Sequence, residues 1–97
     1  MKMHELKTIN PYFQNVWNRT KTFEIRKNDR EFEEGDFLWL REYVPREKYD
    51  YDGESPYTGR ELICLVKYLL TSDRFEGLAR GYCAMSIVVI QEKEQCR

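Results

Sequence analysis

The residues with the clearest capacity for chemistry are three charged side chains within six positions, Lys21, Glu24 and Arg26. They alternate with Phe23 and Ile25, which is typical of a half-buried strand with a dry apolar face and a charged face. Lys21 and Arg26 can bind phosphate, the arginine bidentately and the lysine as a point charge. Glu24 can hold Arg26 in place. A plainer hypothesis is an ion-pair lattice that anchors a helix to the sheet.

Other kinds of site find little support in the sequence. The cysteines Cys64, Cys83 and Cys96 are widely spaced, so we expect neither a zinc site nor a disulfide framework. His4 is the single histidine; it could be a base or a nucleotide ligand, but one near a terminus is more often a surface residue. Without metal-ligand spacing or a glycine-rich phosphate loop, we expect no metal and no cofactor.

The composition predicts one small domain. The 97 residues are 41% hydrophobic and can bury a core, and the net charge of -1 gives no bulk attraction to nucleic acid. The charge is uneven, because residues 1–30 carry seven Lys or Arg and three Asp or Glu, whereas residues 31–54 carry three and nine. We therefore expect any anion site to be local and to lie in the first third of the chain.

The sequence also bears on where the chain works. It has no long apolar run, so we expect no membrane span, and no apolar segment follows residues 1–5, so we expect no signal peptide. Unpaired cysteines favour a reducing cytoplasm. The oligomeric state stays open, with a monomer favoured.

The elements that must position the charged residues are mostly strands. Alternating apolar and polar positions predict strands over residues 4–9, 22–27, 37–44, 61–70 and 82–90. Asn10-Pro11 predicts the start of a short helix that ends near residue 20. Between these elements we expect turns, a long loop over residues 45–58 and a frayed polar tail over 91–97. The expected inward-facing positions are Phe13, Val16, Trp17, Leu38, Leu40, Val44, Leu62, Cys64, Val66, Tyr68, Leu70, Cys83, Met85, Ile87 and Val89.

These elements predict a mainly β fold of the α+β type, with about five mixed or antiparallel strands and no β-α-β alternation. Closing the sheet into a small barrel removes its free edges, and the early helix covers one opening. We expect a single domain over residues 1–97 with its core over about residues 4–90.

The stretch Lys21-Thr22-Phe23-Glu24-Ile25-Arg26 resembles the signature of the ASCH domains, a branch of the PUA-like barrel superfamily. That signature reads Gly-x-Lys-x-x-Glu-x-Arg; Lys21, Glu24 and Arg26 match, whereas Arg19 stands in place of the glycine. The likeness to a small uncharacterised bacterial and phage subgroup covers nearly the whole chain. It includes His4-Glu5-Leu6-Lys7, Asn28-Asp29-Arg30, Gly35-Asp36, Glu42-Tyr43, Tyr57-Thr58-Gly59-Arg60, Gly81-Tyr82 and Met85-Ser86-Ile87.

The resemblance implies a PUA-like barrel with a cleft beside the early helix, which binds RNA or a nucleotide-like ligand. Lys21, Glu24 and Arg26 would meet in that cleft. His4 and Lys7 would line the same cleft, and Asn28 and Arg30 would extend it. Tyr43 and Tyr82 would stack on a base.

Two other functions stay open. Some relatives of the ASCH domains are amidohydrolases that remove an acyl group from a modified cytidine with a Lys, a Thr and a Glu. Here Lys21 matches the lysine, but Glu24 stands where the threonine would fall, and Thr22 is the nearest hydroxyl. A carboxylate such as Glu24 can still act as a base. The third function is a protein-interaction module that uses the Tyr-rich loop. We expect binding rather than catalysis.

Overall fold

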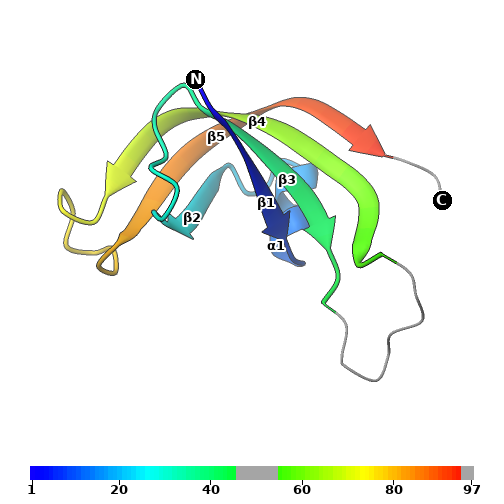
Figure 1. Ribbon diagram of the computed structural model, residues 1–97, viewed down its shortest axis with the longest axis horizontal. Coiled ribbons are helices and arrows are strands. Elements are labelled where there is room, and N and C mark those ends of the chain that lie inside the picture. Colours follow the sequence, from blue (N-terminus) through cyan, green and yellow to red (C-terminus); the bar gives the residue numbers. More distant parts are fainter. Residues whose placement is uncertain (46–54, 95–97) are drawn as a thin grey trace.

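A computed structural model describes residues 1–45 and 55–94 of the chain. These residues form one curled, mixed sheet of five strands and one short helix (Figure 1). The mainly β class is therefore confirmed. The elements in chain order are β1 (Met3–Thr8), α1 (Tyr12–Trp17), β2 (Phe23–Lys27), β3 (Phe37–Tyr43), β4 (Tyr57–Thr71) and β5 (Tyr82–Glu94).

The sheet is an open half-barrel. The strand order is β1-β3-β4-β5-β2, with β1 parallel to β3 and the other pairs antiparallel. In the described part no ladder joins β1 to β2, so the sheet arches without closing (Figure 1). We call the gap between β1 and β2 the seam. The barrel prediction is thus confirmed only as a curled sheet.

The concave side of the arch holds the core. Inward positions of β1, β3, β4 and β5 alternate with outward ones, and α1 lies under the arch rather than across an opening (Figure 1). In the described part of the chain, no helix is long and apolar enough to cross a membrane. The buried hydrophobic residues are Leu6, Phe13, Val16, Phe32, Leu38, Leu40, Leu62, Cys64, Val66, Cys83, Met85 and Ile87.

Three of the predictions change, and the first concerns Val44, which lies beyond the end of β3 and is 45% exposed instead of facing inward. A register shift between Val66 and Tyr68 leaves Tyr68 55% exposed, and Leu69 takes its place against the core. β5 continues to Glu94, which pairs with Arg60, so residues 91–94 extend a strand instead of starting a frayed tail. The rest of that tail and most of the predicted loop, 46–54, lie outside the described residues.

Candidate functional site

β2 presents Glu24 and Arg26 to the interior and Phe23 and Ile25 to the outside. Glu24 is 2% exposed, whereas Phe23 is 45% and Ile25 52% exposed. The face predicted to be dry is therefore the open one, which corrects the sequence-based orientation. The physical reason is that the buried carboxylate finds cationic partners, without which its burial would be costly.

Glu24 lies between the two cations predicted to act with it. Lys21 Nζ donates to Glu24 Oε2 at 2.5 Å and to the Phe23 carbonyl at 2.6 Å. Arg26 Nε donates to Glu24 Oε1 at 2.9 Å. Because the glutamate is buried and both cations stay partly exposed, it fixes their positions while leaving them accessible to a ligand.

Two arginines from the β2 side bridge the seam. Arg26 Nη1 donates to the carbonyl of Lys7 at 3.2 Å, and its Nη2 donates to Thr8 Oγ1 at 3.1 Å. Arg30 Nη1 donates to the carbonyl of Glu5 at 2.7 Å. These bonds occupy outward-facing carbonyls of β1, so guanidinium groups connect the two ends of the sheet where backbone pairing does not.

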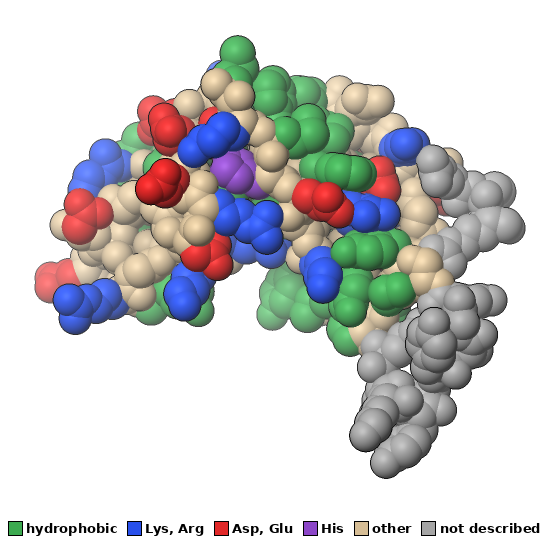
Figure 2. Space-filling model, viewed as in Figure 1, with side chains coloured by type: hydrophobic (Ala, Val, Ile, Leu, Met, Phe, Trp, Pro, Cys, Tyr) green, Lys and Arg blue, Asp and Glu red, His purple; other side chains and the backbone are tan. Residues whose placement is uncertain are grey.

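A cleft of about 770 Å³ opens beside α1 and the seam. This volume lies in the range of roughly 300–1,000 Å³ that is usual for small-molecule sites. Figure 2 shows basic side chains gathered above the hollow beneath the arched sheet. The lining residues are Lys7, Thr8, Ile9, Tyr12, Asn15, Thr20, Lys21, Phe23, Glu24, Ile25 and Arg26.

Two exposed aromatic rings lie beside the cationic part of the cleft. Lys21 Nζ is 5.0 Å from the ring centroid of Phe23 and 6.0 Å from that of Tyr12. The sequence did not single out Tyr12 as a site residue. The sequence feature that could have identified it is its position next to the buried Phe13 on the exposed side of α1. The cleft thus combines fixed cations with flat apolar surfaces.

His4 does not belong to the described lining of the cleft. It is 7% exposed and its Nε2 lies 2.9 Å from Asp36 Oδ2. Burial opposes ionisation of Asp36, but hydrogen bonds from His4 and from the backbone N–H groups of Lys2 and Glu33 outweigh it and lower its pKa. His4 therefore holds the turn before β3 onto β1.

Four other predicted ligand residues also lie outside the described lining of the cleft. Asn28 Oδ1 accepts from the N–H of Phe32, which stabilises the turn after β2. Tyr43 lies at the C-terminal end of β3 under the ammonium of Lys7, Tyr82 pairs with Lys27 at the C-terminal end of β2, and Arg30 bridges the seam. Of the predicted ligand set, the structure brings together Lys7, Lys21, Glu24 and Arg26.

A comparison with protein families matches residues 3–87 to DUF3850, a domain of unknown function. The chain belongs to the DUF3850 family. No curated protein matches it. The match includes β1, α1 and β2, so the whole cleft lies within the part of the chain that defines the DUF3850 domain.

Of the three residues considered for hydrolysis, Lys21 and Glu24 line the cleft of this DUF3850 domain, whereas Thr22 does not. Thr22 instead lines a separate hollow of about 230 Å³, which Lys21 and Val88 also line. Burial raises the pKa of the Cys64 thiol to about 12, so it stays protonated and unreactive. Within the ranges that the structure covers, His, Cys, Asp and Glu form no group of three that could hold a metal ion.

A second polar cluster of the DUF3850 domain anchors α1 to the sheet. Glu42, 5% exposed, accepts from Arg60 Nε and Nη2 at 2.8 Å each and from Asn10 Nδ2 at 2.7 Å. The hydrogen bonds from Arg60 lower the pKa of Glu42 to about 2, and those from Thr58 and Asn10 contribute less to this shift. The Arg60 guanidinium also lies 4.7 Å from the ring centroid of Trp17. This cluster thus holds α1 to the sheet, while Lys21, Glu24 and Arg26 form an ion-pair lattice of their own.

Replacing Glu24 with alanine is expected to lower the free energy of unfolding by about 1–3 kcal/mol, because Lys21 and Arg26 lose their shared acceptor. Urea unfolding at neutral pH measures the change. Replacing Glu33, which is 71% exposed, is the control and should cost less than about 0.5 kcal/mol. Equal losses in the two variants would show that the buried carboxylate has no special role.

Proposed function

We propose that this DUF3850 domain binds RNA or a nucleotide-like ligand in the cleft beside the seam. The observation that carries the proposal is that Glu24 fixes Lys21 and Arg26 at a cleft that is also lined by the exposed rings of Tyr12 and Phe23. A nucleotide has the matching two parts, an anionic phosphate and a flat base that stacks on aromatic rings.

The cations retain donors for a phosphate. Lys21 uses two of its three ammonium hydrogens, on Phe23 and Glu24, so one stays available. Arg26 donates hydrogen bonds to Glu24, Lys7 and Thr8 from a guanidinium with five N–H groups, so at most two remain. With Lys7, these residues give the cleft an excess of positive charge, which favours an anionic ligand.

The turn before Lys21 supports a place among the ASCH domains of the PUA-like superfamily. Arg19 has a backbone φ of 69°. Non-glycine residues seldom adopt this left-handed conformation, whereas glycine does so readily. Arg19 stands where the ASCH signature has glycine, so the conformation of the turn fits the signature even though the residue differs. The buried free thiols Cys64 and Cys83 fit a cytoplasmic setting.

Replacing Lys21 with alanine is expected to weaken binding of a nucleotide or short single-stranded RNA about tenfold or more, since a charged hydrogen bond contributes about 1.5–3 kcal/mol. A thermal-shift screen of nucleosides, nucleotides and oligonucleotides identifies the ligand, because binding to the folded state raises the melting temperature. Titration calorimetry then measures the affinities. Because the ligand makes few phosphate contacts, its affinity should decrease only slightly as the salt concentration rises.

The matched control is Lys67→Ala, which removes an exposed lysine from β4, away from the cleft. Its affinity should equal that of the unchanged chain. Equal affinities for all three proteins, or no ligand in the screen, would refute the proposal.

A further inference from the structure

The convex side of the sheet carries a contiguous apolar surface. The cross-strand register places four outward residues in one row, Met3, Phe37, Leu65 and Val88. Met3 is 55% and Val88 49% exposed. Figure 2 shows hydrophobic side chains along this upper side of the arch. Single exposed hydrophobic residues are ordinary, whereas a row across four strands is typical of an interaction surface.

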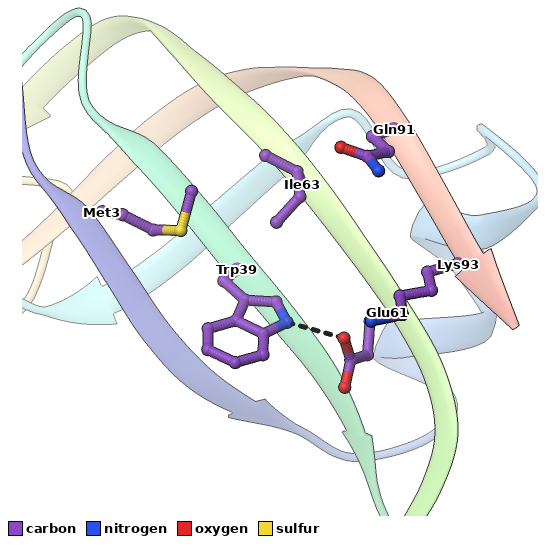
Figure 3. Close-up of a pocket in the computed structure, with 6 residues that line it drawn as sticks. All are labelled: Met3, Trp39, Glu61, Ile63, Gln91 and Lys93. Carbon is purple, nitrogen blue, oxygen red and sulfur yellow. Dashed lines mark hydrogen bonds between the residues drawn. The ribbon is translucent and has the colours of Figure 1, made fainter. Parts of the chain in front are cut away.

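A pocket of about 240 Å³ opens on this face beside the apolar row. Figure 3 shows Trp39 and Ile63 at its apolar end and Glu61, Gln91 and Lys93 at its polar end. Trp39 Nε1 donates to Glu61 Oε1 at 3.0 Å, so the indole is held in place before anything binds. The pocket is smaller than a usual nucleotide or drug site and suits a protein side chain.

Two charged residues line the pocket, Glu61 and Lys93. The second oxygen of Glu61 accepts from Arg41 Nε at 3.2 Å, and Arg41 also donates to Glu5 at 2.8 Å. Arg41 therefore pairs with both carboxylates within the face. Among the residues that the structure covers, Lys93 has no ion-pair partner. A group that enters the pocket thus meets an apolar floor and one available ammonium.

We propose that this convex face docks a segment of a partner protein, which places an apolar side chain in the Trp39 pocket and a carboxylate on Lys93. A second copy of the chain fits less well, because two faces that both curve outward touch only along a narrow zone (Figure 1). The surface lies on the opposite side of the sheet from the core and does not share a lining residue with the nucleotide cleft. It therefore gives the domain a second function beyond the proposed one.

Selection of short random peptides, displayed on phage, against the full chain tests the proposal. Enriched peptides should carry an aromatic or large aliphatic residue close to Asp or Glu. A synthetic enriched peptide should lose about tenfold or more of its affinity with Lys93→Glu or Val88→Asp, since these change the charge and the apolar row. Both side chains are exposed, so both variants should keep the melting temperature of the unchanged chain.

Arg80→Glu is the charge-matched control at an exposed position of the β4–β5 connection, and it should leave peptide affinity unchanged. Peptides without the acidic-apolar pattern, or binding insensitive to both convex-face variants, would overturn the proposal. A dimer that sedimentation detects and that Val88→Asp dissociates would also overturn it, because the occupant would then be a second copy of the chain. Binding to vesicles of phosphatidylcholine and phosphatidylserine that Val88→Asp abolishes would make it a membrane.

Discussion

Replacing Glu42 with alanine is expected to lower the free energy of unfolding by about 3–5 kcal/mol, the usual cost of breaking a buried ion pair. The carboxylate is buried and both its oxygens accept from Arg60. Without it, the Arg60 guanidinium beside Trp17 loses its hydrogen-bonded counter-charge. Asn10 and Thr58 lose an acceptor as well. Urea unfolding at pH 7 measures the loss.

The acid limb of the stability curve checks the same residue. Folding lowers the pKa of Glu42 from 4.5 to about 2. Its contribution is therefore complete above about pH 4.5 and is lost as the pH falls toward 2, with a size of roughly 3 kcal/mol. The Glu42→Ala variant should lack this part of the acid transition. Glu92→Ala, which breaks an exposed pair with Arg19, should keep it and cost under about 1 kcal/mol. Identical acid curves for all three proteins would contradict the assignment.

Replacing Phe13 with alanine is expected to lower the free energy of unfolding by about 3–5 kcal/mol. The side chain is fully buried, and α1 has only six residues. Such a helix is held by packing rather than by its own propensity. Because Tyr12 and Asn15 of α1 line the cleft, ligand affinity should fall together with stability. Urea unfolding and calorimetry measure the two effects.

Tyr12→Ala separates these effects, because Tyr12 adjoins Phe13 but is 52% exposed. It should change stability by no more than about 0.5 kcal/mol while removing about 1–3 kcal/mol of stacking energy from the ligand. If Tyr12→Ala destabilised the fold as much as Phe13→Ala, the two faces of the helix would not have the roles assigned here.

Most elements could be predicted because their hydrophobic periods are strong. Cys83, Met85 and Ile87 face inward as the alternation in β5 predicts, and Phe13 and Val16 are the buried face of α1. Alternation alone, however, separates two faces without saying which one is buried. In β2 the charged face is inside, and only the contacts of Glu24 with Lys21 and Arg26 explain why.

Features that depend on distant partners could not be predicted. Glu42 is stabilised by Asn10 from the chain before α1 and by Thr58 and Arg60 from β4, and no local pattern connects these segments. The register shift that exposes Tyr68 likewise depends on how β4 pairs with β5. For the cleft, charge density pointed to the first third of the chain, but its aromatic wall became evident only with the fold.

The seam has a consequence for how the domain behaves when it is crowded. A bare outer strand invites neighbouring molecules to add strands of their own, and this growth leads to fibrils. On β1 the carbonyls of Glu5 and Lys7 already accept from Arg30 and Arg26. An incoming strand would have to displace both guanidinium groups before it could pair. The side chains that bridge the ends of the arch therefore also keep separate molecules from polymerising through that edge.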